Sequence, residues 1–286
     1  MSNITSSMFD SIKSALAADN DNNKSAIGDI LKTPPGNTFT VRLLPYSKDP
    51  SKTFFHYYQH GWNSFATGQY TSAISLQTFG ERDPIAEERY KILRTGSNEE
   101  KEKAKAIVRS EKWLVNVYVV NDPVNPENNG KVKMLRYGKQ IHNIITDAIE
   151  GEDASELGPR IFDLSPNGVN FRVKVEKQGD FPTYVSSKFA MPSAIEGLDE
   201  DSHKEIYDST FDLSSVFSVK SSDDLKTMLD EHYYVKDATT TTTTVMFNKE
   251  ENNTPVEPVV SSPVVEEKKD DNEDEVLKEL LEGLDV

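Results

Sequence analysis

Residues 113–137 read WLVNVYVVNDPVNPENNGKVKMLRY, and this stretch decides the fold. Its first part, WLVNVYVV, is rich in Val and aromatic residues, which is typical of a buried strand. The Pro, Asn and Gly residues that follow favour a tight turn. Residues 132–137 then predict the returning strand. We therefore expect an antiparallel pair of strands near the middle of the chain.

Further strands and helices are expected on both sides of this pair. Strand patterns occupy residues 38–45, 53–59 and 169–176, and the last of these alternates cleanly between apolar and polar side chains. Helices are expected over four ranges, two of them opened by the caps Asp83 and Ser97: residues 84–95, 97–110, 138–150 and 222–231. The pattern predicts a mainly β protein with inserted helices, of the α+β class, and a small β-barrel fits it.

The composition excludes several classes of protein. The 286 residues include no cysteine, which rules out disulfides, thiolate zinc sites and thiol nucleophiles. No apolar run approaches the roughly 18 residues of a membrane span. The first residues lack the basic and apolar regions of a secretory signal. We expect a soluble intracellular protein with no membrane partner.

The net charge of −16 is concentrated at the C-terminus. Residues 248–286 hold 13 acidic residues and four lysines, and they follow a run of six threonines. This composition predicts a disordered acidic tail over residues 236–286. Its tip carries leucines at helical spacing, which favours docking on partner proteins; a frayed end is the alternative. The docking residues would be Leu277, Leu280, Leu281 and Leu284.

A basic region lies inside this acidic chain. Residues 101–140 hold nine basic and four acidic residues. Lys112 and Lys133 lie within or beside the strands of the central pair, next to aromatic residues. A groove with cations for phosphates and aromatic faces for bases is what sequence-tolerant single-strand binding needs.

Catalytic motifs are not apparent. The chain has no P-loop, GxGxxG, GxSxG or HExxH motif. His56 and His60 would share one face of a strand, where they could pair on a metal, but we interpret them as ordinary strand histidines. The chain is therefore expected not to be an enzyme. A metal-dependent nuclease that uses these histidines is a distant alternative.

Residues 116–141, NVYVVNDPVNPENNGKVKMLRYGKQI, resemble the single-stranded DNA-binding (helix-destabilising) proteins of T4-like bacteriophages. The family pattern here is N-(I/V)-x-V-V-x-D-P-x-x-P-E-N-x-G-K-V-x-x-x-R-(F/Y)-G-K-x-I. Weaker matches extend along most of the chain. They are Arg42-Leu43-Leu44-Pro45, His60-Gly61, Asn170-Phe171, the Phe181/Tyr184 spacing, Ser187-Lys188-Phe189 and Ser193-Ala194-Ile195.

The resemblance implies an OB-fold-like core over residues 36–235, with an inserted subdomain and a cleft for single-stranded DNA. It implies a role in phage DNA replication, recombination and repair, in the cytoplasm of the infected bacterial host. The acidic tail would recruit replication and recombination proteins. Residues 1–35 would serve cooperative self-association on DNA. Residues 6–17 have a helical apolar stripe that could mediate it: Phe9, Ile12 and Leu16.

The resemblance also assigns candidate DNA-binding residues, to which the basic region adds Lys112 and Lys133. The aromatic candidates are Trp113, Tyr137, Phe181 and Tyr184, and each could instead be part of the core. The cationic candidates from the resemblance are Arg42, Arg109, Arg136 and Lys139.

The sequence departs from the family in two places. The inserted subdomain of the family holds zinc through one His and three Cys, whereas this chain has His60 with Ser75, Ile85 and Glu88. We therefore predict no zinc or other cofactor, and a subdomain held by packing alone, through such residues as Tyr90, Ile92 and Leu93. The N-terminal segment of the family is basic, whereas the first 23 residues here contain a single lysine.

One alternative belongs to another functional class. An acidic interaction or scaffold protein could dock its partners through the C-terminal tip without binding DNA. Trp113, Phe181 and Tyr184 would then be core residues.

Overall fold

The computed structural model describes residues 27–179 and 181–235, all within one compact unit, Met1–Thr239. Several expectations lie outside the described residues. These are the helix over residues 6–17 with Phe9, Ile12 and Leu16, and the tail over residues 236–286 with its four leucines.

The long central strand β4 (Arg109–Asn121) organises the fold. Its first half pairs with β2 (Phe54–Asn63), and its second half pairs with β1 (Asn37–Leu44). Strand β5 (Val132–Tyr137) pairs with the middle of β4. All three pairings are antiparallel, which confirms the expected central pair. The positive φ of Gly130 (78°) completes the turn between β4 and β5, a conformation that favours glycine.

Four further strands extend this sheet in the order β3-β2-β4-β1-β6-β7, with β8 also on β6. Their bounds are β3 (Tyr70–Ile74), β6 (Val169–Gln178), β7 (Phe181–Thr183) and β8 (Lys188–Pro192). Within residues 27–179 and 181–235 no pairing joins β5 to β8, so the sheet is open there. The mainly antiparallel α+β class is confirmed, whereas the described pairings do not close the expected barrel.

The main helices are α2 (Pro84–Thr95), α3 (Asn98–Ala104), α4 (Lys139–Glu150), α5 (Glu200–Asp208) and α6 (Ser222–Leu229). The cap at Asp83 and the capping box at Ser97 are both confirmed. The helix expected over residues 97–110 is too long. After α3 and a short 3₁₀ turn the chain extends, because Arg109 pairs with His60 on β2. None of the helices in the described ranges has the length and apolar character to cross a membrane.

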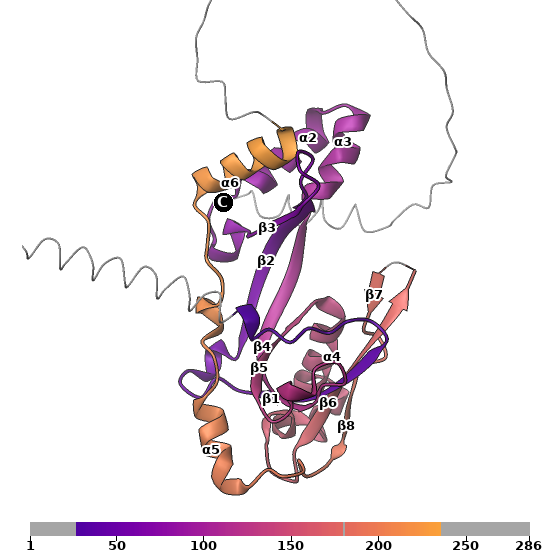
Figure 1. Cartoon of the computed structure of the whole chain (residues 1–286), viewed down its shortest axis with the longest axis vertical. Coiled ribbons are helices and arrows are strands. Elements are labelled where there is room, and N and C mark those ends of the chain that lie inside the picture. The colour runs from indigo at the N-terminus through magenta and orange to yellow at the C-terminus, as the bar shows by residue number, and fades with distance from the viewer. Residues whose placement is uncertain (1–26, 180, 236–286) are drawn as a thin grey trace, which may run out of the picture. The chain divides into compact units, whose positions relative to one another are not determined.

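Two main hydrophobic clusters hold the sheet and helices together. The larger joins the inward faces of β1, β4 and β6 to α4, and includes Phe39, Val117 and Phe171. The other joins Trp62 on β2 to α2, α3 and α6. Figure 1 shows these three helices gathered at one end of β2. The part of the chain around this second cluster, β2–β3 with α2, α3 and α6, is called the helical subdomain below.

Short elements were missed by the sequence patterns. Strands β3, β7 and β8 have three to five residues, which is too few for an alternating pattern to be recognised. Helix α5 has nine residues and no fully buried side chain, so its apolar stripe is weak.

Candidate nucleic-acid interface

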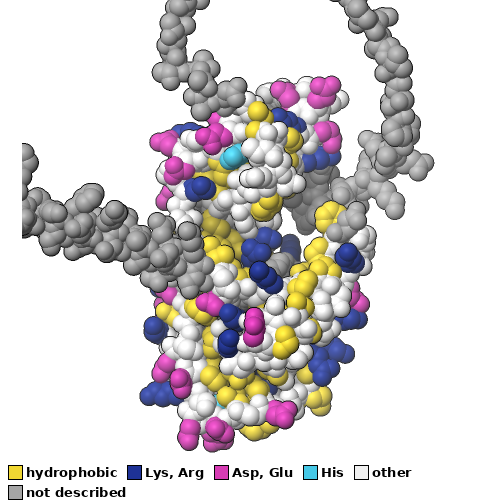
Figure 2. All heavy atoms as spheres, viewed as in Figure 1, with side chains coloured by type: hydrophobic (Ala, Val, Ile, Leu, Met, Phe, Trp, Pro, Cys, Tyr) yellow, Lys and Arg dark blue, Asp and Glu magenta, His cyan; other side chains and the backbone are white. Residues whose placement is uncertain are grey.

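A groove of about 850 Å³ opens beside the β4–β5 pair. Five parts of the chain line it: residues 27–34, Lys112 on β4, residues 124–125 of the β4–β5 connection, the end of β5 with the first turn of α4, and the arm that contains β7. The lining includes four cations and no Asp or Glu, and we call it the basic groove. Figure 2 shows a hollow in which Lys and Arg side chains gather. The four lining cations are Lys32, Lys112, Arg136 and Lys139.

Strand alternation places two of these cations close together. Arg136 is exposed between the buried Leu135 and Tyr137, and it pairs in register with Leu114, two residues from Lys112. Burial lowers the pKa of Lys112, and the nearby positive charge of Arg136 lowers it further. A bound anion would relieve this repulsion.

None of the four groove cations forms an ion pair with an acidic side chain of residues 27–179 and 181–235. Cations without carboxylate partners in a concave site attract anions and raise their local concentration. This charge pattern is therefore suited to a polyanion.

Residues 29–31 form one wall of the basic groove along the edge of β5. The amide of Leu31 donates to the carbonyl of Met134 (2.8 Å), and the amide of Met134 donates to the carbonyl of Asp29 (2.9 Å). Lys133 forms an ion pair with Asp29 (2.6 Å), and its side chain is only 16% exposed. Lys133 therefore holds the wall and is not among the groove lining.

The arm at β7 supplies apolar and aromatic side chains to the basic groove. Pro182 and Tyr184 line the groove, and Tyr184 also packs against the larger cluster. Phe181 lies beside them on β7 and is 77% exposed. An exposed Phe at this position argues against the scaffold alternative, in which Phe181 would be buried.

Trp113 lies beneath the surface and is only 6% exposed. Its ring stacks against the rings of His142 (centroids 4.1 Å apart) and His56 (4.8 Å). Tyr137 is also buried, although it contributes to the groove lining, and burial raises its pKa. Trp113 was a candidate stacking residue, but its neighbours within the fold already occupy its faces.

Two further cationic candidates lie outside the groove lining. Arg109 at the start of β4 stacks over the ring of Tyr58 (4.3 Å to the centroid). Arg42 on β1 is fully buried. Its guanidinium donates to Asn170 Oδ1 (3.0 Å), to the carbonyl of Ser193 (3.0 Å) and to the carbonyls of Asp163 and Ser165. In this structure the donors of Arg42 serve the protein's own oxygens, and its assignment to DNA stays a prediction.

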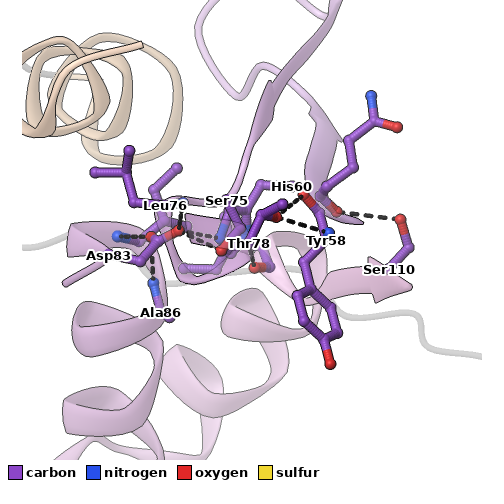
Figure 3. Close-up of polar contacts among 11 residues, drawn as sticks. Tyr58, His60, Ser75, Leu76, Thr78, Asp83, Ala86 and Ser110 are labelled. Atoms are coloured by element: carbon purple, nitrogen blue, oxygen red, sulfur yellow. Dashed lines mark hydrogen bonds and ion pairs between the residues drawn. The ribbon is translucent and has the colours of Figure 1, made fainter. Parts of the chain in front are cut away.

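A buried polar network lies in the helical subdomain (Figure 3). His60 Nε2 is 3.1 Å from Asp83 Oδ2, and His60 Nδ1 is 3.2 Å from the carbonyl oxygen of Ile107. The Ser75 hydroxyl and the backbone amides of residues 76, 85 and 86 also donate to Asp83. Both ring nitrogens of His60 therefore lie within hydrogen-bond distance of an oxygen atom.

This network corrects two interpretations of the sequence. His60 is not an ordinary strand histidine, because it is 1% exposed and paired with a carboxylate. The helical subdomain is not held by packing alone, since Asp83 ties β2, the loop before α2 and α2 itself together. Of the packing residues expected on α2, Ile92 is buried, whereas Tyr90 and Leu93 are only partly so.

The donor set of this network does not resemble a metal centre. In the described ranges there is no group of three or more His, Asp or Glu side chains close enough to hold a metal ion. Ile85 is fully buried and offers no ligand atom. Glu88 hydrogen-bonds with Tyr234 and Lys91 instead of facing His60.

The structure thus brings five of the ten sequence candidates to the basic groove: Lys112, Arg136, Tyr137, Lys139 and Tyr184. Sequence reasoning missed four polar members of the lining: Lys32, Thr33, Asn125 and Gln140. The run Lys32-Thr33-Pro34-Pro35 predicts extended chain before β1, and a basic residue at its start was the only available signal.

Comparison with known proteins shows the family of this chain. A family model described as "gp32 DNA binding protein like" matches residues 36–236. The single-stranded DNA-binding protein of Enterobacteria phage T4 is 31% identical over 193 residues, which cover 65% of this chain and 63% of the relative. The single-stranded DNA-binding protein of Enterobacteria phage T2 matches to the same extent.

The chain spans less than two thirds of the length of these two relatives. The family match nevertheless covers most of the described residues, including nearly all of the groove-lining residues beyond position 35 and the whole buried network. It confirms the resemblance drawn from residues 116–141. The chain therefore belongs to the gp32 DNA-binding-protein-like family.

Proposed function

We propose that this chain binds single-stranded DNA, with little regard to sequence, in the basic groove. One observation carries the proposal: four cations that form no ion pair with a carboxylate of residues 27–179 and 181–235 share a groove with the aromatic residue Tyr184. The phage T4 and T2 relatives are named single-stranded DNA-binding proteins, which agrees with it.

The proposed mechanism combines phosphate neutralisation with base stacking. The groove cations would neutralise phosphates, and Tyr184 with the exposed Phe181 would offer faces to bases. Each stacked base contributes about 1–3 kcal/mol regardless of its identity. Three to five phosphate contacts predict a log–log salt slope of roughly −2 to −3.5 for single strands.

The wider role follows from the family and from the sequence. The chain would act without catalysis in phage DNA replication, recombination and repair, in the cytoplasm of the infected bacterial host. The curved open sheet would be an OB-fold-like core that functions without zinc. Residues 1–35 would support self-association, and the acidic tail would recruit replication and recombination proteins. Stoichiometric zinc in the purified protein would contradict the proposal that the core functions without zinc.

The proposal is tested by titrating fluorescein-labelled oligo(dT) with the full chain and following anisotropy at several salt concentrations. A label is preferable to intrinsic fluorescence, because Trp62 and Trp113 are both buried. Saturable binding that weakens with salt, and weaker binding of a duplex of equal length, are expected.

The same titration with residues 248–286 deleted tests the role of the tail. An acidic segment that competes with DNA for the groove predicts tighter binding after the deletion at low salt, together with loss of partner binding. If the full chain and the shortened form bind oligo(dT) with equal affinity at low salt, the acidic tail does not compete with DNA for the groove. Failure of both forms to bind would contradict the proposed function.

A further inference from the structure

One side chain connects the β7 arm to the wall of the groove that carries cations. Gln140 is the second residue of α4 and directly follows Lys139. Its Oε1 accepts a hydrogen bond from the backbone amide of Tyr184 (2.8 Å) and a longer one from the Thr183 hydroxyl (3.5 Å). Gln140, Lys139 and Tyr184 all line the basic groove.

Tyr184 packs against the larger cluster and its carbonyl accepts a hydrogen bond from the Ser187 amide (2.9 Å), but the strand just before it is short. Strand β7 has three residues, and it pairs only with the last residues of β6, from Glu176 to Gln178. The exposed Phe181 is the first residue of β7 and pairs with Gln178 at the outer end of this ladder. A short two-stranded arm is marginally stable by itself. The contact with α4 therefore restricts how far Tyr184 can move from Lys139.

We propose that Gln140 is a positioning residue for the bound strand: it fixes the distance between the stacking side chain Tyr184 and the cations Lys139 and Arg136. The inference rests on the proposed function of the groove. Successive phosphates and bases of one strand have a fixed spacing, so both surfaces must be in place together for one strand to use both. A preorganised site avoids the entropic cost of ordering the arm during binding.

The test compares Gln140→Met, which keeps the length of the side chain and removes the acceptor, with Gln140→Glu, which keeps the acceptor and adds a negative charge. Gln178→Met, an exposed position on the same arm, is the matched control. The measurements are oligo(dT) affinity from low to high salt, dissociation rate, and hydrogen exchange of the Tyr184 amide in the free full chain.

For Gln140→Met we expect about five- to tenfold weaker binding at every salt concentration, mostly through faster dissociation, with an unchanged salt slope. Exchange of the Tyr184 amide should be about tenfold faster. Gln140→Glu should keep slow exchange, bind weakly at low salt and approach the wild type at high salt, where its charge is screened. Which of the two variants binds oligo(dT) more tightly would then depend on the salt concentration.

Wild-type affinity and exchange in Gln140→Met would overturn the inference. Weaker binding with unchanged exchange of Tyr184 would also overturn it, because Gln140 would then contact the strand directly. The wild-type titration keeps the two proposals separate: if the wild type does not bind oligo(dT), the proposed function itself fails.

Discussion

In the basic groove, Lys112 and Arg136 lie near each other and pair with no carboxylate in the described part of the chain, whereas in the helical subdomain His60 lies 3.1 Å from Asp83. The groove cations are open to solvent to different degrees, and Arg136 is exposed. Both members of the His60–Asp83 pair are at most 1% exposed. The groove leaves its cations available for a ligand, whereas the helical subdomain pairs its buried polar side chains with each other.

This difference separates binding from stability. A buried charge must be paired within the fold, because water cannot solvate it. A charge at the surface of a groove can be left for a ligand. Arg42 and Arg136 illustrate the point, since both are arginines on strands of one sheet, yet only Arg136 faces the groove.

The largest effect is expected from Asp83→Asn. The change removes the buried carboxylate and leaves the buried ring of His60 without its carboxylate partner. We expect a loss of about 3–5 kcal/mol in the free energy of unfolding, measured with urea. The matched control is Asp49→Asn, which alters an exposed cap and should cost about 1 kcal/mol or less. Equal losses for both variants would mean that the network contributes little.

Acid should weaken the same network. Burial alone would raise the pKa of Asp83, but hydrogen bonds from His60, Ser75 and the backbone lower it from 3.8 to about 2. The unfolded chain therefore takes up this proton at higher pH than the folded protein. The stabilisation is complete above the unfolded pKa and is lost as the pH falls from about 4 to 2, by about 2 kcal/mol.

The measurement is the free energy of unfolding between pH 5 and pH 2 for the wild type and Asp83→Asn. The difference between the two proteins should shrink as the pH falls, because protonation removes in the wild type the charge that the variant already lacks. A constant difference would show that the charge of Asp83 is not the source of its effect.

The sequence predicted the scaffold of both regions better than their chemistry. Elements with local signals were found: α2 by its cap, β4 by its Val and aromatic content, and β6 by its alternating pattern. Asp83 was recognised as a helix cap, which depends on local sequence alone. Its pairing with His60, 23 residues away, depends on how β2 and α2 pack, and no local pattern encodes it.

The candidate site shows the same limit. The basic and aromatic residues of the β4–β5 pair were found because they are close in sequence. A residue type does not reveal burial, however, so Arg42 and Trp113 could not be separated from Arg136 and Tyr184. The wall at residues 29–31 was missed because it joins β5 through backbone hydrogen bonds, which any sequence can make.

Arg136→Gln tests the groove side of the comparison. Loss of one phosphate contact should weaken oligo(dT) binding about tenfold at low salt and reduce the salt slope by about 0.7. Thermal stability should change little. Arg42→Gln should lower the melting temperature, because it removes buried hydrogen bonds. It should leave the salt slope of DNA binding by the folded protein unchanged. A reduced slope in both variants would place Arg42 on the DNA as well.

The smallest effect is expected from Lys133→Gln, compared with Lys139→Gln. The two lysines are six residues apart and were both candidates, yet Lys133 is paired with Asp29, whereas Lys139 lines the groove. Lys133→Gln should cost up to about 1 kcal/mol in stability, as expected for a partly exposed ion pair, with a change in DNA affinity of about twofold or less. Lys139→Gln should reduce the salt slope by about 0.7 and leave stability unchanged. If both variants reduced the slope equally, Lys133 would leave Asp29 when DNA binds, and pairing in the free protein would no longer separate structural cations from binding cations.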